Sequence, residues 1–290
     1  MIAITGATGQ LGQLVIEQLL QKLPANQIIA LVRNPAKASE LQARGLQVRT
    51  ADYDQPDTLE TALQGVDKLL LISSSEVGKR LEQHRNVVSA AKKSGVKLLA
   101  YTSILNAEDS IMDLAHEHKE TEQLIKASGI PFVFLRNGWY TENYTAGIPT
   151  ALQFNALLGS AGDGKISLAT RADYAAAAAE VLVRDNQAGK VYELAGDEAY
   201  TLAEFAAELS QQTGKHIPYN NLPEAEYRAI LQNAGLPEWL AELLASSDAS
   251  AAQGALCDNS HQLSQLIGRA TTPLAESIKT ALTGVTHAAH

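Results

Sequence analysis

The chain has 290 residues, of which 46% are hydrophobic and 19% charged, and its formal net charge at pH 7 is −9. This composition is ordinary for a globular protein with a sizeable core. The excess of acidic residues argues against a nucleic-acid partner, because such binding depends on Lys and Arg neutralising phosphates.

A single cysteine, Cys257, excludes an internal disulfide and a cysteine-based zinc site, and we expect no metal. No basic segment followed by an apolar stretch begins the chain, which argues against a signal peptide. No apolar run approaches the ~20 residues that a membrane helix needs. We therefore expect a cytoplasmic protein without a membrane partner.

The first 150 residues alternate short apolar runs with longer amphipathic ones, which predicts βαβ units and a parallel sheet. Strands are expected at Ile2–Thr5, Ile28–Val32, Gln47–Ala51, Lys68–Ile72, Leu98–Thr102 and Phe132–Arg136. Helices are expected at Gln10–Lys22, Pro35–Ala43, Pro56–Leu63, Arg80–Ser94 and Ala115–Ser128. This pattern predicts the α/β class with a Rossmann, doubly wound parallel sheet.

After Arg136 the alternation ends. Short strands are expected at Ile166–Ala169 and Val191–Leu194, and helices at Arg171–Arg184, Thr201–Thr213, Glu224–Gly235, Pro237–Ser246 and Pro273–Leu282. We expect residues 1–150 to form a nucleotide-binding Rossmann domain. Residues 151–290 are expected to form a smaller, mostly helical lobe on the substrate side, partly interleaved with the first domain.

The first expected strand is followed by a glycine-rich loop, Gly6-Ala7-Thr8-Gly9-Gln10-Leu11-Gly12. Gly6 permits a sharp turn, Gly9 lets the backbone approach a pyrophosphate, and Gly12 lets the helix sit tightly on the sheet. The N-terminus of that helix offers free amides and a partial positive charge, which favour phosphate. The loop therefore predicts a dinucleotide site, with a glycine-rich turn that binds no ligand as the alternative.

The end of the second expected strand indicates which dinucleotide is bound. NAD-specific sites usually place an acid there to hold the ribose 2′-hydroxyl, but this strand ends in Arg33-Asn34. A guanidinium pairs well with a 2′-phosphate, which a carboxylate would repel. The sequence thus predicts NADPH as the cofactor, with Arg33 as a solvated loop charge as the alternative.

Two more polar groups follow strands at the same edge of the sheet. Asp52 can accept a hydrogen bond from an adenine amino group or form a turn, and the sequence favours neither. Ser73-Ser74-Ser75 ends the fourth strand, where ligands bind in open α/β sheets. We expect these hydroxyls to bond to ribose or phosphate, with a plain turn as the alternative.

The usual acid of the short-chain dehydrogenases is missing. Members with this glycine loop usually use Tyr-x-x-x-Lys, in which the lysine lowers the pKa of the tyrosine. None of the nine tyrosines is followed by a lysine four residues later, and the fifth helix carries Leu114 and His118 at the two positions. A quinone needs such an acid least, because its reduced anion is resonance-stabilised and its reduction depends mainly on proximity and orientation. His116 and His118 are candidate proton donors, with a structural role on the helix as the alternative.

The sixth expected strand leads into Asn137-Gly138-Trp139-Tyr140-Thr141-Glu142-Asn143-Tyr144, where a nicotinamide should lie. Asn137 can hold the carboxamide, and Gly138 allows a close approach. Tyr140, Asn143 and Tyr144 combine flat surfaces with neutral donors, which suits a planar, uncharged acceptor. Tyr140 and Asn143 therefore join His118 as catalytic candidates, whereas Trp139 can serve packing alone.

Segments along nearly the whole chain resemble the NmrA-like branch of the atypical short-chain dehydrogenases. They are Ile4–Gly12, Val32–Asn34, Leu69–Ser73, Leu135–Tyr140, Gly162–Ile166 and Gln265–Gly268. Within that branch the chain is similar to the bacterial NAD(P)H:quinone oxidoreductases and, more distantly, to triphenylmethane-dye reductases. The resemblance implies two-electron reduction of a quinone to its hydroquinone. It also implies that NADPH is contacted by Gly6, Ala7, Thr8, Gly9, Gln10, Leu11, Arg33, Ser73, Ser74, Ser75, Asn137, Gly138, Trp139, Tyr140, Thr141, Glu142 and Leu168.

Three functional hypotheses remain. The first is an NADPH-dependent reductase of quinones or similarly planar acceptors. The second is a reductase of another acceptor, such as a cationic triphenylmethane dye. The third is a non-catalytic redox sensor that binds NADP(H) and a protein partner, which the missing Tyr-x-x-x-Lys motif favours. The sequence leaves open the oligomeric state, the physiological acceptor and whether NADH is also used.

Overall fold

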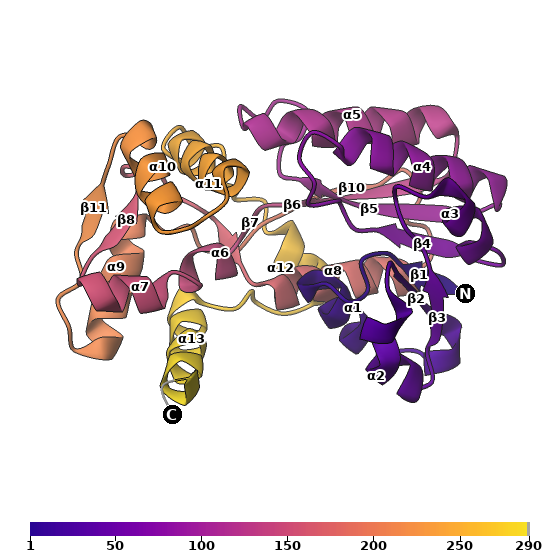
Figure 1. Ribbon diagram of the computed structural model, residues 1–290, viewed down its shortest axis with the longest axis horizontal. Coiled ribbons are helices and arrows are strands. Elements are labelled where there is room, and N and C mark those ends of the chain that lie inside the picture. The colour runs from indigo at the N-terminus through magenta and orange to yellow at the C-terminus, as the bar shows by residue number, and fades with distance from the viewer. Residues whose placement is uncertain (289–290) are drawn as a thin grey trace. The chain divides into compact units, whose positions relative to one another are not determined.

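The computed structural model describes the backbone of residues 1–288 and the side chains of residues 1–284. The chain divides into two compact units, each of which is described by itself (Figure 1). Unit 1 comprises Met1–Glu108, His116–Asn137 and Arg171–Leu194. Unit 2 comprises Asp109–Ala115, Gly138–Thr170 and the residues from Ala195 onward.

Unit 1 is built on a sheet of seven parallel strands in the order β10-β6-β5-β4-β1-β2-β3. The strands are β1 (Ile2–Ile4), β2 (Ile28–Val32), β3 (Gln47–Thr50), β4 (Lys68–Leu71), β5 (Leu98–Ile104), β6 (Phe132–Asn137) and β10 (Val191–Leu194). Strand β1 pairs with β2 on one side and with β4 on the other, so the order in which strands are added to the sheet reverses at β1. Such a reversal leaves a crevice at the carboxyl ends of the strands. The predicted α/β Rossmann sheet is confirmed, and the strand expected at Val191–Leu194 extends it beside β6.

Helices cover both faces of this sheet (Figure 1). They are α1 (Gln10–Leu20), η1 (Ala25–Gln27), η2 (Pro35–Ala38), α2 (Ser39–Ala43), α3 (Pro56–Ala62), α4 (Arg80–Lys93), α5 (Asp113–Ser128) and α8 (Arg171–Val183). Helices α1 and α8 pack against each other, as do α3 and α4. The single helix expected at Pro35–Ala43 is wrong: the backbone of Ala38, at φ −116° and ψ 16°, separates η2 from α2.

Unit 2 contains two small parallel sheets, β7 with β9 and β8 with β11, and seven helices among its described residues. Its strands are β7 (Trp139–Tyr140), β8 (Leu157–Gly159), β9 (Leu168–Ala169) and β11 (Tyr219–Asn221). Its helices are α6 (Glu142–Thr145), α7 (Ile148–Phe154), α9 (Leu202–Thr213), α10 (Glu224–Asn233), α11 (Glu238–Ala251), α12 (Gln262–Ile267) and α13 (Leu274–Ala288). Within the described part of the chain, no helix is both long and apolar enough to span a membrane.

A buried ion-pair cluster ties α5 to three strands of unit 1. Both oxygens of Glu122 accept hydrogen bonds from Arg136, at 2.9 Å from Nε and 2.7 Å from NH2. The third nitrogen of Arg136, NH1, donates to Glu193 on β10 at 2.8 Å, and Ser103 on β5 donates to Glu122 at 2.6 Å. The Glu122 bonds, partly opposed by burial, raise the pKa of Arg136. The cluster thereby fixes the carboxyl end of β6, the strand that ends at Asn137.

We expect Arg136→Met to destabilise the protein by about 3–5 kcal/mol, because it leaves the buried carboxylate of Glu122 without its main cationic partner. Urea unfolding followed by circular dichroism measures the loss. Arg184→Met is the matched control, since Arg184 pairs with Glu180 on the surface and is 45% exposed. Equal losses for the two variants would contradict a special contribution of the buried pair.

Candidate functional site

A cavity of about 460 Å³ lies in unit 1 at the carboxyl ends of β1, β2, β3 and β4. Its walls come from four segments that each follow a strand. They are Gly6 with residues 8–12, residues 31–34 with Lys37, residues 51–53, and residues 72–76 with Gln83. The cavity therefore occupies the crevice that the reversal of strand order at β1 creates.

The glycine loop forms one wall of this cavity. Gly6 adopts φ +57°, and the amide of Gly9 donates to its carbonyl at 2.9 Å. A Cβ atom on Gly12 would lie 2.2 Å from the Gly6 carbonyl oxygen and 2.9 Å from Cα of Ala7. Gly12 was expected to let the helix sit tightly on the sheet. The close contact that it allows is instead between α1 and the backbone of the glycine loop itself. Since the first amides of a helix lack intrahelical acceptors, this geometry turns the α1 N-terminus into an anion-binding end.

The other residues of the glycine loop differ in whether they line the cavity. Thr8, Gln10 and Leu11 line the cavity, as Gly6 and Gly9 do. Ala7 is fully buried, its amide donates to the Leu31 carbonyl at 3.3 Å, and it is not among the lining residues. Ala7 thus supports the loop from the core side.

Arg33 and Asp52 lie on the cavity walls beyond β2 and β3. Arg33 is exposed, and its NH1 lies 3.6 Å from Oε1 of Glu76. Asp52 accepts hydrogen bonds from the Asp54 amide at 3.0 Å and from the Gln55 side chain at 3.1 Å. The sequence left open whether Asp52 binds an adenine or forms a turn, and in the structure its carboxylate stabilises a turn.

The loop after β4 is held by one residue, Ser74, all of whose polar groups are engaged by the first turns of α4. Its amide donates to Nε2 of His84 at 2.9 Å, and its carbonyl accepts from Nε of Arg80 at 2.7 Å. Its hydroxyl bonds to Gln83 and accepts from the Glu76 amide. The Ser74 hydroxyl, expected to face a ribose or phosphate, is thus used inside the protein. The neighbouring Ser73 and Ser75 are half-buried or exposed on the same wall.

His84 has to be neutral to accept from Ser74. Its Nε2 is the acceptor, so the proton lies on Nδ1, which is 3.0 Å from the Thr121 hydroxyl. Thr121 in turn donates to the Glu117 carbonyl at 2.8 Å. Burial and the nearby charge of Arg80 lower the pKa of His84 to about 3. The chain of bonds is therefore intact at neutral pH.

The two histidines of α5 differ in environment. His118 is buried, and its Nδ1 lies 2.7 Å from the Tyr101 hydroxyl. Burial, followed by the charge of Arg80, lowers its pKa well below the ordinary value, so it holds no spare proton at neutral pH. His116 is 77% exposed and pairs with Glu120. Neither lines the cavity, and the buried environment disfavours His118 as a proton donor.

Asn137 ends β6 and is 5% exposed. Its backbone carbonyl accepts from the Leu105 amide at 2.9 Å. Its side-chain oxygen Oδ1 has no hydrogen-bond partner among the described residues. Buried polar atoms are nearly always bonded, so this unpartnered acceptor is unusual, although Asn137 does not line the cavity.

The remaining predicted cofactor residues belong to unit 2, where a small sheet brings several of them together. Trp139 and Tyr140 of β7 pair with Leu168 and Ala169 of β9. The Thr141 amide continues this ladder by donating to the Ala169 carbonyl at 2.9 Å. Segments about 30 residues apart in sequence thus become neighbours. Gly138 is buried beside them, and Glu142 begins α6 as a half-buried residue.

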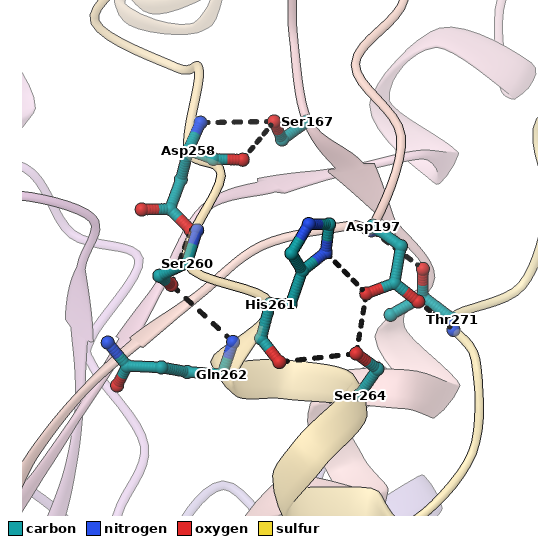
Figure 2. Close-up of polar contacts among 8 residues, drawn as sticks. All are labelled: Ser167, Asp197, Asp258, Ser260, His261, Gln262, Ser264 and Thr271. Carbon is teal, nitrogen blue, oxygen red and sulfur yellow. Dashed lines mark hydrogen bonds and ion pairs between the residues drawn. The ribbon is translucent and has the colours of Figure 1, made fainter.

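The strand carrying Leu168 is held by the segment that precedes α13 (Figure 2). The hydroxyl of Ser167 donates to the Asp258 carbonyl at 3.0 Å and accepts from the Asp258 amide at 3.1 Å. Gly196 packs so closely that a Cβ there would lie 1.9 Å from the Leu168 carbonyl oxygen. This contact could not be predicted from the sequence, because the three segments are far apart along the chain.

Asp197, the residue after Gly196, joins three parts of the same segment (Figure 2). Its carboxylate accepts from the Ser264 hydroxyl at 2.5 Å, the Thr271 amide at 2.9 Å and His261 at 3.2 Å. Burial alone would raise the pKa of Asp197, but these bonds together lower it. The Ser264 hydroxyl bonds to the Asp197 carboxylate and to the backbone carbonyl of His261, not to the imidazole ring, so this cluster anchors the backbone and is not a nucleophilic triad.

Helix α6 carries Asn143 and Tyr144, which have different surroundings. Asn143 is half-buried, whereas Tyr144 is buried and donates to Oδ1 of Asp248 at 2.7 Å. The other oxygen of Asp248 accepts from the Ser160 amide at 2.9 Å. Burial raises the pKa of Asp248 to about 6, although both hydrogen bonds oppose the shift. Tyr144 is thus occupied by a structural bond.

Comparison with known proteins identifies relatives over nearly the whole chain. The NmrA-like family model matches residues 1–282. Quinone oxidoreductase 2 of Escherichia coli (strain K12) is 59% identical over 278 residues, which cover 96% of this chain and 97% of that protein. These matches confirm the resemblance inferred from the sequence motifs.

Two solved structures share the fold at high identity. The crystal structure of an NADPH-dependent quinone oxidoreductase from Escherichia coli complexed with NADPH gives a TM-score of 0.95 at 58% identity, covering 97% of this chain and 100% of that one. The structure of Citrobacter sp. triphenylmethane reductase complexed with NADP(H) gives a TM-score of 0.94 at 43% identity, with the same coverage.

The raised pKa of Asp248 predicts a pH dependence of stability. Its folded-state pKa of about 6 exceeds the ordinary 3.8, so folding disfavours the ionised form. Wild-type protein should therefore lose stability relative to Asp248→Asn as the pH rises from about 4 to about 7, by at most about 3 kcal/mol, with no further change above. Urea unfolding of both proteins across this range tests it. A difference that is independent of pH would refute it.

Proposed function

Since the chain belongs to the NmrA-like family, we propose that it is an NADPH-dependent oxidoreductase that reduces a quinone to its hydroquinone by two electrons. The observation that carries this proposal is the match, along nearly the full length of both chains, to a quinone oxidoreductase from Escherichia coli whose structure holds NADPH. The family alone would not name an acceptor; the level of identity supports this one.

The residues around the cavity fit the dinucleotide. The glycine loop and the amides at the start of α1 would hold its pyrophosphate. Arg33 would bind the 2′-phosphate, and the hydroxyls of Ser73 and Ser75 would bond to the ribose or phosphate groups. Outside the cavity lining, Asn137 at the end of β6 would accept from the carboxamide through its unpartnered buried oxygen. The cofactor, once bound, supplies the hydride. Contacts from Gly138, Trp139, Tyr140, Thr141, Glu142 and Leu168 remain part of the proposal.

The lack of a positioned acid agrees with a quinone acceptor. Reduction to the hydroquinone requires a hydride and a proton, but the reduced anion is resonance-stabilised and takes its proton readily from water. The protein then has to bind and orient the acceptor, which alone can lower a barrier considerably. With His118 buried and neutral, we propose Tyr140 and Asn143 as residues that orient the acceptor's oxygens.

A second candidate is reduction of a planar cationic dye. It is favoured by the likeness to the Citrobacter triphenylmethane reductase. Because both activities would draw on the same cofactor, they differ only in the acceptor.

The decisive experiment mixes the purified protein with NADPH and a benzoquinone and follows the loss of absorbance at the nicotinamide band. Turnover of the quinone at a higher kcat/KM than a triphenylmethane dye supports the proposal. The reverse order supports the second candidate. Tight NADPH binding without turnover of either acceptor would instead support a redox sensor.

Arg33→Ala tests the cofactor assignment. We expect it to weaken NADPH binding by about 1.5–3 kcal/mol, the range for a charge-assisted hydrogen bond, and to leave NADH binding nearly unchanged. Isothermal titration with each cofactor measures both effects. An equal loss for the two cofactors would show that Arg33 does not read the 2′-phosphate.

A further inference from the structure

The loop after β4 brings a carboxylate to the cavity beside Arg33. Glu76 lines the cavity, and its Oε1 lies 3.6 Å from NH1 of Arg33. Its Oε2 lies 3.8 Å from Nζ of Lys79 on the same loop. The guanidinium that is proposed to bind a 2′-phosphate therefore has an anionic partner supplied by the chain itself.

Hydrogen bonds to Ser74 and Lys79 fix the backbone of Glu76. Its amide donates to the Ser74 hydroxyl at 3.1 Å, and its carbonyl accepts from the Lys79 amide at 3.1 Å. Ser74 is in turn anchored by Arg80 and His84, both buried. Because the loop is held at buried groups, the pair separates through rotation of the Glu76 or Arg33 side chain and not through movement of the loop backbone.

This carboxylate affects the two nicotinamide cofactors differently. A phosphate monoester carries between one and two negative charges at neutral pH. To bind it, Arg33 has to exchange the Glu76 carboxylate for the phosphate, and the phosphate then lies near a like charge. An uncharged ribose 2′-hydroxyl is subject to neither effect, so the carboxylate acts selectively against the phosphorylated cofactor.

We propose that Glu76 is a specificity-determining residue: it weakens binding of 2′-phosphorylated dinucleotides and so reduces the preference of the cavity for NADPH over NADH. The inference rests on the proposed function, because it takes Arg33 as the group that binds the 2′-phosphate. Arg33 establishes the preference for the phosphorylated cofactor, and Glu76 limits how large that preference is.

The test is calorimetric titration of the purified protein with NADP⁺ and, separately, with NAD⁺ at low ionic strength. Glu76→Gln keeps the size of the side chain and removes its charge. NADP⁺ should bind about 2–5-fold more tightly to this variant, the range expected for a solvent-exposed charge pair, while NAD⁺ affinity should change by less than about 1.5-fold. The gain for NADP⁺ should shrink at ~0.5 M salt, where exposed charges are screened.

Glu82→Gln is the matched control, because Glu82 is an exposed carboxylate in the first turn of α4 that does not line the cavity. It should leave both affinities unchanged. In an Arg33→Ala background, Glu76→Gln should strengthen NADP⁺ binding less than it does with Arg33 present, since no competition for the guanidinium remains.

Three results would overturn the role of Glu76. They are NADP⁺ binding that is unchanged or weaker in Glu76→Gln, an equal gain for NAD⁺, and an equal gain in Glu82→Gln. Arg33→Ala alone separates this failure from that of the proposed function. A selective loss of NADP⁺ affinity there, with Glu76→Gln neutral, refutes only the role of Glu76, whereas an unselective loss refutes the cofactor assignment itself.

Discussion

The cavity depends on how closely α1 approaches the loop before it. At Gly12 the backbones are so near that a single Cβ would collide with the Gly6 carbonyl, and Gly6 itself turns through a positive φ. These two positions let the helix begin directly at the carboxyl end of β1. The partial positive charge of its first amides then lies among residues from four loops. A side chain at either glycine would move the helix start and separate the anion-binding amides from Arg33 and the serines.

Buried polar residues hold the loop after β4, which forms another wall of the cavity. Every polar group of Ser74 forms a hydrogen bond, and its partner His84 is also hydrogen-bonded to Thr121 on α5. In a low-dielectric interior such bonds are strong when complete, and an unpartnered member is costly. The network therefore favours one arrangement of the loop. It leaves Ser73, Ser75 and Glu76, which follow the same strand, to face the cavity.

Sequence reasoning succeeded where the signal was local. Strand, glycine loop and helix follow one another without interruption, so the Rossmann sheet and the turn at Gly6 could be predicted from the first 12 residues and the alternation after them. It failed where the contact is long-range. No local pattern at Leu168 or Gly196 indicates that their backbones lie in contact, or that β7 pairs with β9. The role of Ser74 was also missed, although Arg80, Gln83 and His84 offered a signal: their spacing places three polar groups on one face of α4.

The buried contacts of α5 explain why this helix does not supply a positioned acid for an acceptor. In short-chain dehydrogenases this helix usually presents a tyrosine and a lysine to the substrate. Here its inward-facing residues are engaged with the sheet: His118 bonds to Tyr101, and Glu122 holds Arg136. Freeing His118 for proton transfer would break a buried bond, and charging it would place a cation beside Arg80, whose charge already lowers its pKa. The buried residues of α5 thus serve the packing of the sheet, which agrees with the proposed quinone, whose reduced form is stable without a positioned proton donor.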